Sequence, residues 1–437
     1  MNILLVGSGA REHTIARAIK KSKHTNNLFC FASSNNPGIK SLCAGYEVGK
    51  ISEPAAVLNF AQINKIDWAF IGPEAPLEAG VVDILDAVSI PSVGPIKQLA
   101  QLETSKSFTR DLLTKYNIPA CPGYKFFTSM NGVKEFIESL GGNYVVKADG
   151  LMGGKGVKVS GDHLASIDEG ISWCQELINS GKTFLIEEKL IGQEFSLMSW
   201  CDGEHLAHMP AVQDHTRAFV GDTGPNTGGM GTYSDGDHSL PFLTSADIDQ
   251  ARKINEATAK AIKNKFNENY KGILYGGFMA TKDGVKLIEY NARLGDPETM
   301  NVLPILESDF IELCQSIIDG NLSQDKAIFS NLATVCKYAV PNGYPDEAVK
   351  NELINISAVT DSDHLYLASV DQKTDGLYET GSRTVAFVGI ASTIAQAEQI
   401  AETEINKITG PLFHREDIGT TELINKRIEM MKELRNI

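Results

Sequence analysis

The sequence has no long apolar run and no pattern of paired cysteines. No stretch approaches the roughly 18 consecutive apolar residues that a membrane-spanning helix requires, so we expect no membrane segment. The 7 cysteines are an odd number, and no two are spaced as Cys-x-x-Cys. This usage argues against a disulfide framework or a zinc site and is typical of a reducing compartment, so we expect a cytoplasmic protein.

Basic residues are scarce relative to acidic ones. The chain has 40 Lys and Arg against 55 Asp and Glu, which gives a formal net charge of −15. Such a chain repels nucleic acid over most of its surface, although local clusters of Lys and Arg still allow small phosphates to bind. The length of 437 residues, with ordinary hydrophobic and charged fractions, predicts about two to four globular domains.

The N-terminal part of the chain, to about residue 100, alternates short apolar runs with helical patterns. This alternation predicts a parallel sheet with helices on both faces. The expected strands are 3–6, 28–32, 68–71 and 90–93, and the expected helices are 12–21, 56–64 and 81–87.

The rest of the chain has a different pattern. Residues 213–233 are rich in Gly, Asn, Thr and Pro and poor in apolar residues, so we expect a long loop that is either functional or disordered. From about residue 332 the pattern predicts a further α+β unit that ends in a charged helix. The other expected elements are β-rich stretches between 124 and 190 and at 195–211, helices at 105–116, near 167–180 and at 246–266, and strands at 273–281 and 285–289.

A first glycine turn, Gly7-Ser8-Gly9, follows an expected strand and opens a helix. Such a turn lets a ligand approach the helix N-terminus, which favours anions. A dinucleotide-binding turn requires a third glycine, where Glu12 stands, and an acid at the end of the second strand, where the chain has Ala32-Ser33-Ser34. A nicotinamide enzyme is therefore disfavoured, and a purely structural turn is the alternative.

The strongest local signal is the segment Lys147–Val157, in which 4 glycines and 2 lysines lie between two β-runs. A loop of this kind lets backbone N–H groups close over phosphates while lysine supplies a positive charge. It is not a Walker A loop, because the spacing differs and the loop joins strand to strand. The alternative is a flexible hairpin without a ligand.

Two acidic patterns follow. The run that contains Glu187, Glu188 and Glu194 falls where a hinge between two subdomains is expected, which favours a nucleotide contact over a solvated face.

On the expected strand near 289, Glu289 and Asn291 project to one face and offer the hard oxygen ligands that Mg²⁺ prefers. The alternative there is a surface strand with an ion pair, but the continuation into Gly-Asp-Pro-Glu favours a site.

The segment 213–231 contains Gln-Asp-His and a Gly-Pro-Asn-Thr-Gly-Gly-Met-Gly run, which are suited to wrap a small polar substrate. On its own, this segment would be interpreted as a disordered surface loop.

His205 and His208 have a metal-like spacing, but without a further ligand nearby they are interpreted as ordinary strand histidines.

Together these segments resemble the glycinamide ribonucleotide synthetases, ATP-grasp ligases that join glycine to 5-phosphoribosylamine. The resemblance covers nearly the whole chain in order, and the run at 222–231 is specific to this family among ATP-grasp enzymes. It is carried by the residues at 7–13, 71–77, 101–106, 147–157, 213–215, 222–231, 293–298 and 415–419.

The resemblance implies a multidomain α/β and α+β chain. An ATP-grasp fold would follow an N-terminal parallel-sheet (Rossmann-like) domain and precede a C-terminal α+β domain. The implied boundaries are 1–104 for the N-terminal substrate-binding domain, 105–123 with 190–330 for the ATP-grasp central domain, 124–189 for its lid subdomain, and 331–437 for the C-terminal domain.

The resemblance also implies the site residues. Arg293 would be catalytic and would stabilise an acyl phosphate formed from glycine, and Glu289 and Asn291 would hold Mg²⁺ or Mn²⁺. The implied ATP contacts are Lys106, Lys147, Gly153, Gly154, Lys155, Gly156, Glu187, Glu188, Leu190 and Glu194. The implied substrate contacts are Gly9, Glu12, Glu74, Asp214, Asn226, Thr227, Gly228, Gly295, Asp296 and Pro297.

The implied partners are the small molecules ATP, glycine and 5-phosphoribosylamine, with no nucleic acid and no membrane, and the chain is expected to be a monomer or a small homo-oligomer. Another ATP-grasp carboxylate–amine ligase or a carboxylase of purine metabolism is the alternative. It would share the patterns at 147–155 and 289–291 but not the run at 222–231. A non-catalytic nucleotide-binding module would be expected to lose charges or metal ligands at 289–293, which this chain keeps.

Overall fold

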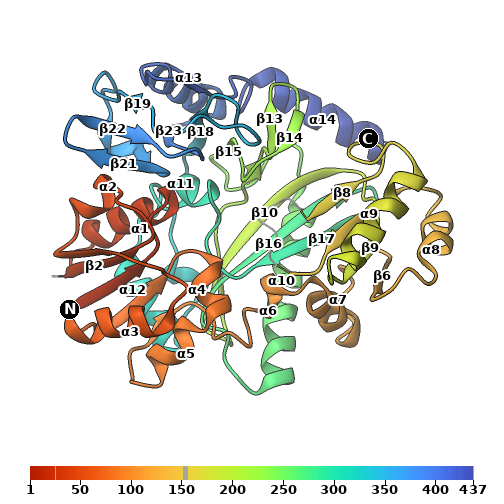
Figure 1. Cartoon of the computed structure of the whole chain (residues 1–437), viewed down its shortest axis with the longest axis horizontal. Helices are drawn as coiled ribbons and strands as arrows, with labels where there is room; N and C mark the ends of the chain where they lie inside the picture. The colour runs from red at the N-terminus through yellow and green to blue at the C-terminus, as the bar shows by residue number, and fades with distance from the viewer. Residues whose placement is uncertain (25, 151–155, 437) are drawn as a thin grey trace.

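The computed structural model describes residues 1–24, 26–150 and 156–436 (Figure 1). The predicted phosphate contacts Gly153, Gly154 and Lys155 lie outside the described residues.

The N-terminal region is built on a parallel sheet with strand order β3-β2-β1-β4-β5. The central strand β1 is buried, and α1 begins directly after Gly9, as the glycine turn predicted. The prediction of a parallel sheet is therefore confirmed. The elements are β1 (Asn2–Val6), α1 (Ala10–Lys21), β2 (Asn27–Ala32), α2 (Pro37–Lys40), β3 (Gly45–Val48), α3 (Pro54–Ile63), β4 (Trp68–Ile71), α4 (Glu74–Ala79), α5 (Val81–Asp86) and β5 (Ser92–Val93).

The sequence pattern did not predict the edge strand β3. Its residues Gly-Tyr-Glu-Val are half-buried or exposed, so it lacks the apolar run of a central strand. Its position is set by parallel pairing with β2.

A four-stranded antiparallel sheet of order β6-β9-β7-β8 follows, and we call it the lid sheet. It has a hydrophobic core of its own, which includes Phe127, Val146 and Phe184. The elements are β6 (Tyr124–Phe127), α8 (Val133–Ser139), β7 (Tyr144–Ala148), β8 (Val157–Val159), α9 (Ile167–Asn179) and β9 (Phe184–Glu188). Figure 1 shows this region at one end of the molecule, away from the N-terminal sheet.

A second antiparallel sheet, which we call the central sheet, has the order β11-β10-β16-β17. The long helix α10 and the helix α7 pack near it, and a capping box between Thr244 and Asp247 fixes the start of α10. The elements are α6 (Gln101–Thr104), α7 (Lys106–Lys115), β10 (Gln193–Cys201), β11 (Leu206–His208), α10 (Ser245–Phe266), β16 (Gly272–Thr281), β17 (Gly284–Asn291), α11 (Glu298–Val302), α12 (Phe310–Asp319) and η1 (Gln324–Lys326).

The C-terminal region supplies most strands of a sheet of order β12-β15-β18-β23-β20, with β24 paired to β18, and forms a small sheet β19-β22-β21. Strands β12 (Gln213–Asp214) and β15 (Gly231–Ser234) come from earlier in the chain. Helix α13 packs on β18 and β23, and α14 ends the chain. The elements are β18 (Ala333–Pro341), β19 (Leu353–Ile354), η2 (Ser362–His364), β20 (Leu365–Leu367), β21 (Val370–Lys373), β22 (Gly376–Glu379), β23 (Val385–Ala391), α13 (Ile394–Ile405), β24 (Leu412–Phe413) and α14 (Thr421–Arg435).

The expectation of a long loop at 213–233 was wrong. The segment contains the short strands β12 (Gln213–Asp214), β13 (Arg217–Phe219) and β14 (Thr223–Asn226) and enters β15 (Gly231–Ser234). Strand β15 pairs with β18 from the C-terminal region, and β13 pairs with β14 in a hairpin. These strands are held by pairing rather than by an apolar repeat, so no local pattern marked them.

Within the described residues, no helix is both long enough and apolar enough to span a bilayer.

Candidate active site

The lid sheet and the helix α7 meet in a buried ion-pair cluster. The carboxylate of Glu187 on β9 accepts hydrogen bonds from Arg110 Nε at 2.7 Å and Nη2 at 3.0 Å. The Lys147 ammonium on β7 lies 2.8 Å from the same carboxylate. Burial alone would raise the pKa of Glu187, but Lys147 and Arg110 outweigh it and lower that pKa to about 2. The Glu187 side chain therefore fixes Lys147, and Arg110 is a site residue that the sequence did not indicate.

Replacing Glu187 by glutamine should destabilise the fold, because the buried charges of Arg110 and Lys147 then lack their partner, at a cost of about 3 kcal/mol. Since the folded pKa of about 2 lies below the ordinary 4.5, the carboxylate stabilises the fold above pH 4.5, and that contribution is lost as the pH falls toward 2. Urea unfolding at neutral and progressively lower pH measures both effects. Glu188→Gln is the control, and an equal loss of stability in both variants would contradict this account.

The same cluster ties the lid sheet to the central sheet. Lys147 Nζ donates to the carbonyl of Ile288 on β17 at 3.0 Å, and Arg110 Nη2 donates to that carbonyl at 2.8 Å. Lys106, at the start of α7, donates from Nζ to the carbonyl of Gly150 at 3.0 Å. Burial lowers the pKa of Lys106, and the carboxylate of Glu289 opposes that shift. The predicted phosphate-binding lysines 106 and 147 are thus brought together beside Glu289.

The remaining predicted nucleotide contacts lie along the same edge. Gly156 precedes β8, and its carbonyl accepts from the amide of Ala148 at 2.8 Å. The Glu188 carboxylate accepts from the amide of Gly123 at 2.8 Å. Leu190 is half-buried between β9 and β10, and Glu194 is exposed on β10. Their contact with a nucleotide stays a prediction.

The two predicted metal ligands lie at the end of β17. Glu289 is exposed, and its carboxylate forms no hydrogen bond or ion pair with the described part of the chain. Asn291 is buried, and its side-chain oxygen accepts from Arg293 Nη2 at 3.0 Å. No group of three or more His, Cys, Asp or Glu suited to a metal occurs in the ranges that the structure describes. Two protein oxygens alone suit a Mg²⁺ that takes its other ligands from water and substrate phosphates.

Arg293 lies among acidic side chains from other parts of the chain. Its Nη2 is 3.3 Å from Glu103 Oε1, and its Nε is 3.7 Å from Glu74 Oε2. Burial opposes the charge of the guanidinium, but Glu103 and Glu74 outweigh it and raise the pKa of Arg293. Glu103 is a second residue that was not singled out from the sequence, although it lies in the run at 101–106, and its carboxylate also accepts from the amide of Ala292 at 2.8 Å.

The N-terminal glycine turn adjoins this site. The Glu12 carboxylate accepts from the amide of Gly9 at 2.6 Å and pairs with Arg11 Nε at 2.5 Å. Arg11 Nη1 in turn donates to the carbonyl of Leu294 at 3.2 Å. A Cβ built on Gly9 would lie 3.6 Å from Asp296 Oδ2, so the turn and the Gly-Asp-Pro-Glu motif lie side by side.

The segment after β14 borders the same motif. A Cβ built on Gly229 would lie 2.7 Å from both Asp214 Oδ1 and Pro297 Cδ, so these groups are in close contact. Burial and then the Glu298 carboxylate raise the pKa of Asp214 well above its ordinary value. Glu298 accepts a hydrogen bond from the Tyr275 hydroxyl at 2.5 Å, and it was not among the predicted site residues although it lies in the run at 293–298.

Of the other predicted substrate contacts, Thr227 donates from its amide to the carbonyl of Thr216 at 2.7 Å, and Asn226 pairs with Arg217 in the hairpin. The carbonyl of Gly295 accepts from the Thr299 hydroxyl at 2.5 Å, which fixes the motif at the start of α11. All predicted substrate contacts within the described residues therefore lie on segments that border Arg293 or Asp296.

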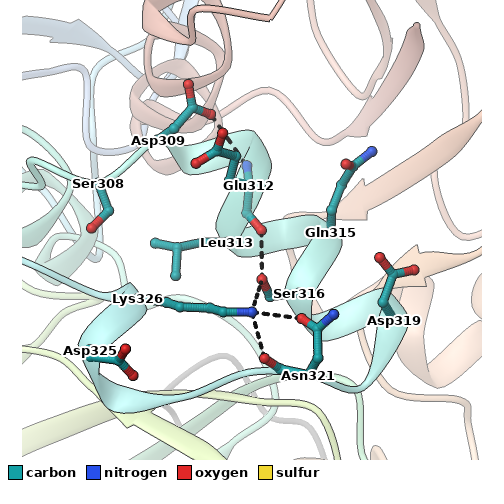
Figure 2. Close-up of a pocket in the computed structure, with 10 residues that line it drawn as sticks. All are labelled: Ser308, Asp309, Glu312, Leu313, Gln315, Ser316, Asp319, Asn321, Asp325 and Lys326. Atoms are coloured by element: carbon teal, nitrogen blue, oxygen red, sulfur yellow. Dashed lines mark hydrogen bonds between the residues drawn. The ribbon is translucent and has the colours of Figure 1, made fainter.

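Two other features lie apart from this site. His208 on β11 bonds Ser199 Oγ at 2.8 Å, and His205 bonds Asp202 at 3.0 Å, as expected for structural histidines. A surface cavity of about 480 Å³ lies on α12 and η1. Figure 2 shows the residues that line it, among which Lys326 bonds Asn321. None of the predicted site residues lines that cavity.

The lid sheet and the central sheet bring Lys106 from α7 and Lys147 from β7 together beside Glu289, near the end of β17. This arrangement defines the ATP-grasp class of enzymes. Solved structures support this class. The phosphoribosylamine–glycine ligase of Thermotoga maritima superposes with a TM-score of 0.80 at 26% identity, covering 95% of this chain and 100% of that chain. The biotin carboxylase domain of the Hydrogenobacter thermophilus 2-oxoglutarate carboxylase shares the fold alone, with a TM-score of 0.73 at 15% identity, covering 100% of this chain and 95% of that chain.

The chain belongs to the phosphoribosylglycinamide synthetase family. The models of its N domain, its ATP-grasp (A) domain and its C domain match residues 1–103, 104–299 and 334–421. The phosphoribosylamine–glycine ligase of Methanosarcina barkeri is 47% identical over 435 residues, covering 100% of both chains. That of Methanocaldococcus jannaschii is 48% identical over 445 residues, again covering 100% of both. The resemblance inferred from the motifs is therefore confirmed.

Proposed function

We propose that this protein ligates glycine to 5-phosphoribosylamine with ATP, giving glycinamide ribonucleotide, ADP and phosphate. The observation that carries the proposal is the setting of Arg293. This residue bonds Asn291 of the metal-suited pair Glu289–Asn291 and lies beside the acids Glu74 and Glu103. The full-length likeness to ligases of that name supports it. No observation favours a carboxylase.

The ATP phosphates would be held by Lys106, Lys147 and the glycine-rich loop, including Gly153, Gly154, Lys155 and Gly156. The clustering of the two described lysines around Glu289 and Gly150 supports this assignment. Glu187 would act through its backbone and by fixing Lys147, and Glu188, Leu190 and Glu194 would contact the nucleoside.

Glu289 and Asn291 would hold a divalent metal, Mg²⁺ or Mn²⁺, and their donor chemistry fits either ion. When bound, that metal would neutralise charge on the nucleotide phosphates. The free carboxylate of Glu289 is available for this role, whereas Asn291 would share its oxygen with Arg293.

The reaction needs no nucleophilic side chain. A carboxylate oxygen of glycine attacks the γ-phosphorus of ATP, ADP leaves, and Arg293 faces the charge of the phosphoryl group. The amine of phosphoribosylamine then attacks the glycyl carbonyl carbon and loses a proton, and the C–O bond to phosphate breaks. Asp214 and Glu298, two neighbouring carboxyl groups that oppose each other's ionisation, suit substrates that carry an amino group.

The other substrate contacts would be made by the N-terminal turn and the segments that border Asp296. Gly9, Glu12 and Glu74 come from the N-terminal sheet, and the rest are Asn226, Thr227, Gly228, Gly295, Asp296 and Pro297. We infer four units at 1–104, 105–123 with 190–330, 124–189 and 331–437. A cytoplasmic location and a monomer or small homo-oligomer complete the proposal.

Glycine labelled with ¹⁸O in its carboxylate should transfer one labelled oxygen to inorganic phosphate in each turnover. The reason is that phosphorylation converts this oxygen into part of the leaving group. Mass spectrometry of phosphate, together with identification of ADP and glycinamide ribonucleotide, measures the outcome. AMP and pyrophosphate would indicate an adenylate, and unlabelled phosphate formed alongside the ribonucleotide would contradict the acyl phosphate.

A further inference from the structure

Arg383, which precedes β23 in the C-terminal region, reaches the segments proposed to bind substrate. Its Nη1 donates to the carbonyl of Gly228 at 2.5 Å, to that of Asp296 at 2.7 Å and to that of Gly229 at 3.3 Å. The same nitrogen lies 3.4 Å from Asp296 Oδ1. One guanidinium thus joins two segments that are far apart in the sequence.

The guanidinium is itself held in place by Tyr338 on β18. Its central carbon lies 4.9 Å from the centre of the buried Tyr338 ring, a cation–π distance. The Tyr338 hydroxyl donates to Asp296 Oδ1 at 2.7 Å. Asp296 is therefore held by a hydroxyl from β18 and by a charge from the segment just before β23, the strand that pairs with β18.

The contact leaves little freedom to the segment 228–229. A Cβ built on Gly228 would lie 3.0 Å from the guanidinium carbon of Arg383. The next residue, Gly229, has a φ of +110° and packs closely against Asp214 and Pro297. The backbone at 228–229 is therefore closely packed against Arg383, Asp214 and Pro297, so a shift of Arg383 would shift this backbone.

We propose that Arg383 is a positioning residue for the glycine and phosphoribosylamine side of the site, and that the C-terminal domain thereby completes that side. The residue acts through Gly228, Gly229 and Asp296 and has no role in holding ATP. A lysine cannot replace it fully, because a compact ammonium lacks the planar face that stacks on Tyr338. The proposal rests on the proposed function, since it concerns the same substrates.

The test compares Arg383→Ala and Arg383→Lys with Arg17→Ala. Arg17 is a matched control, because it also donates to backbone carbonyls of the C-terminal region, of Ser362 and Asp363, and lies 4.8 Å from the centre of the Tyr366 ring. Steady-state kinetics give KM for glycine, phosphoribosylamine and ATP separately, and thermal unfolding reports stability.

We expect Arg383→Ala to lower kcat/KM for glycine and phosphoribosylamine about a hundredfold, because a small misplacement of reacting groups reduces the rate by about that factor. The KM for ATP should stay unchanged. Arg383→Lys should recover part of this loss, and Arg17→Ala should leave all three KM values unchanged. A uniform fall in all parameters that parallels thermal destabilisation would overturn the proposal, as would unchanged glycine and amine kinetics.

Tyr338→Phe provides a second variant if Arg383→Ala does not fold. It removes only the hydroxyl that bonds Asp296 and should shift KM for the same two substrates in the same direction, but less. Unchanged KM values for both substrates in this variant would count against the proposal. Failure of the parent enzyme to form glycinamide ribonucleotide would instead contradict the proposed function, so the two failures are distinguishable.

Discussion

Replacing Arg293 by lysine should lower kcat/KM for glycine about a thousandfold while nucleotide binding persists. The guanidinium bonds Asn291, a proposed metal ligand, and lies beside Glu74 and Glu103, where it would face the charge of a transferring phosphoryl group. Removal of one such preorganised donor costs up to about a thousandfold in rate. Lysine keeps a positive charge near the two carboxylates, so the loss reports the geometry of the guanidinium rather than the loss of an ion pair.

The measurement pairs steady-state kinetics with calorimetric titration of ATP into the variant. A variant whose kcat/KM stays within about tenfold of the parent would contradict the role assigned to Arg293, since tenfold corresponds to only about 1.4 kcal/mol of transition-state stabilisation. A variant that no longer binds ATP would show instead that Arg293 belongs to the nucleotide site. Thermal unfolding controls for the loss of contacts to Glu103.

Replacing Glu289 by glutamine should raise the metal concentration needed for activity by more than about a hundredfold, since even a group that only supports a metal ligand contributes 10–100-fold to metal affinity. The carboxylate is exposed beside Lys106 and forms no hydrogen bond with the described residues, so it is available to a cation. Glutamine keeps the shape of the side chain and removes its charge.

Matched controls are His205→Asn and His208→Asn, because these histidines have metal-like spacing but bond Asp202 and Ser199 instead. After a chelator has removed bound metal, the activity of each variant is measured at increasing concentrations of Mg²⁺ and of Mn²⁺. The metal concentration needed for activity distinguishes the three variants. A histidine variant that loses its metal response while Glu289→Gln keeps it would refute the assignment.

Local sequence patterns were sufficient for elements that are specified by their own residues. The apolar run of β1 and the glycine turn before α1 predicted a strand, a turn and a helix correctly. The two β-runs on either side of the glycine-rich segment predicted β7 and β8, and these strands pair with each other. In each case the local sequence specifies the element, although β1 also pairs with the distant β4.

Features fixed by distant partners could not be predicted in this way. Arg293 meets Glu103 across 190 positions of sequence only because α6 packs against β17, and no spacing rule joins them. Arg383 belongs to none of the motifs, and only the fold brings it to Gly228. The fold brings the predicted motif residues close together, whereas the contacts of Arg110, Glu103 and Arg383 depend on tertiary packing that no motif indicates.

The pairing of β15 with β18 has a consequence for synthesis of the chain. Strand β15 follows directly after the glycine-rich substrate segment, but its neighbour β18 lies in the C-terminal region and is made much later on the ribosome. The lid sheet and the central sheet can form while β18 is still untranslated, since every strand in them precedes it. We therefore expect a nascent chain to form the two sheets proposed to bind the nucleotide before it completes the pairing next to the segment proposed to bind the amine.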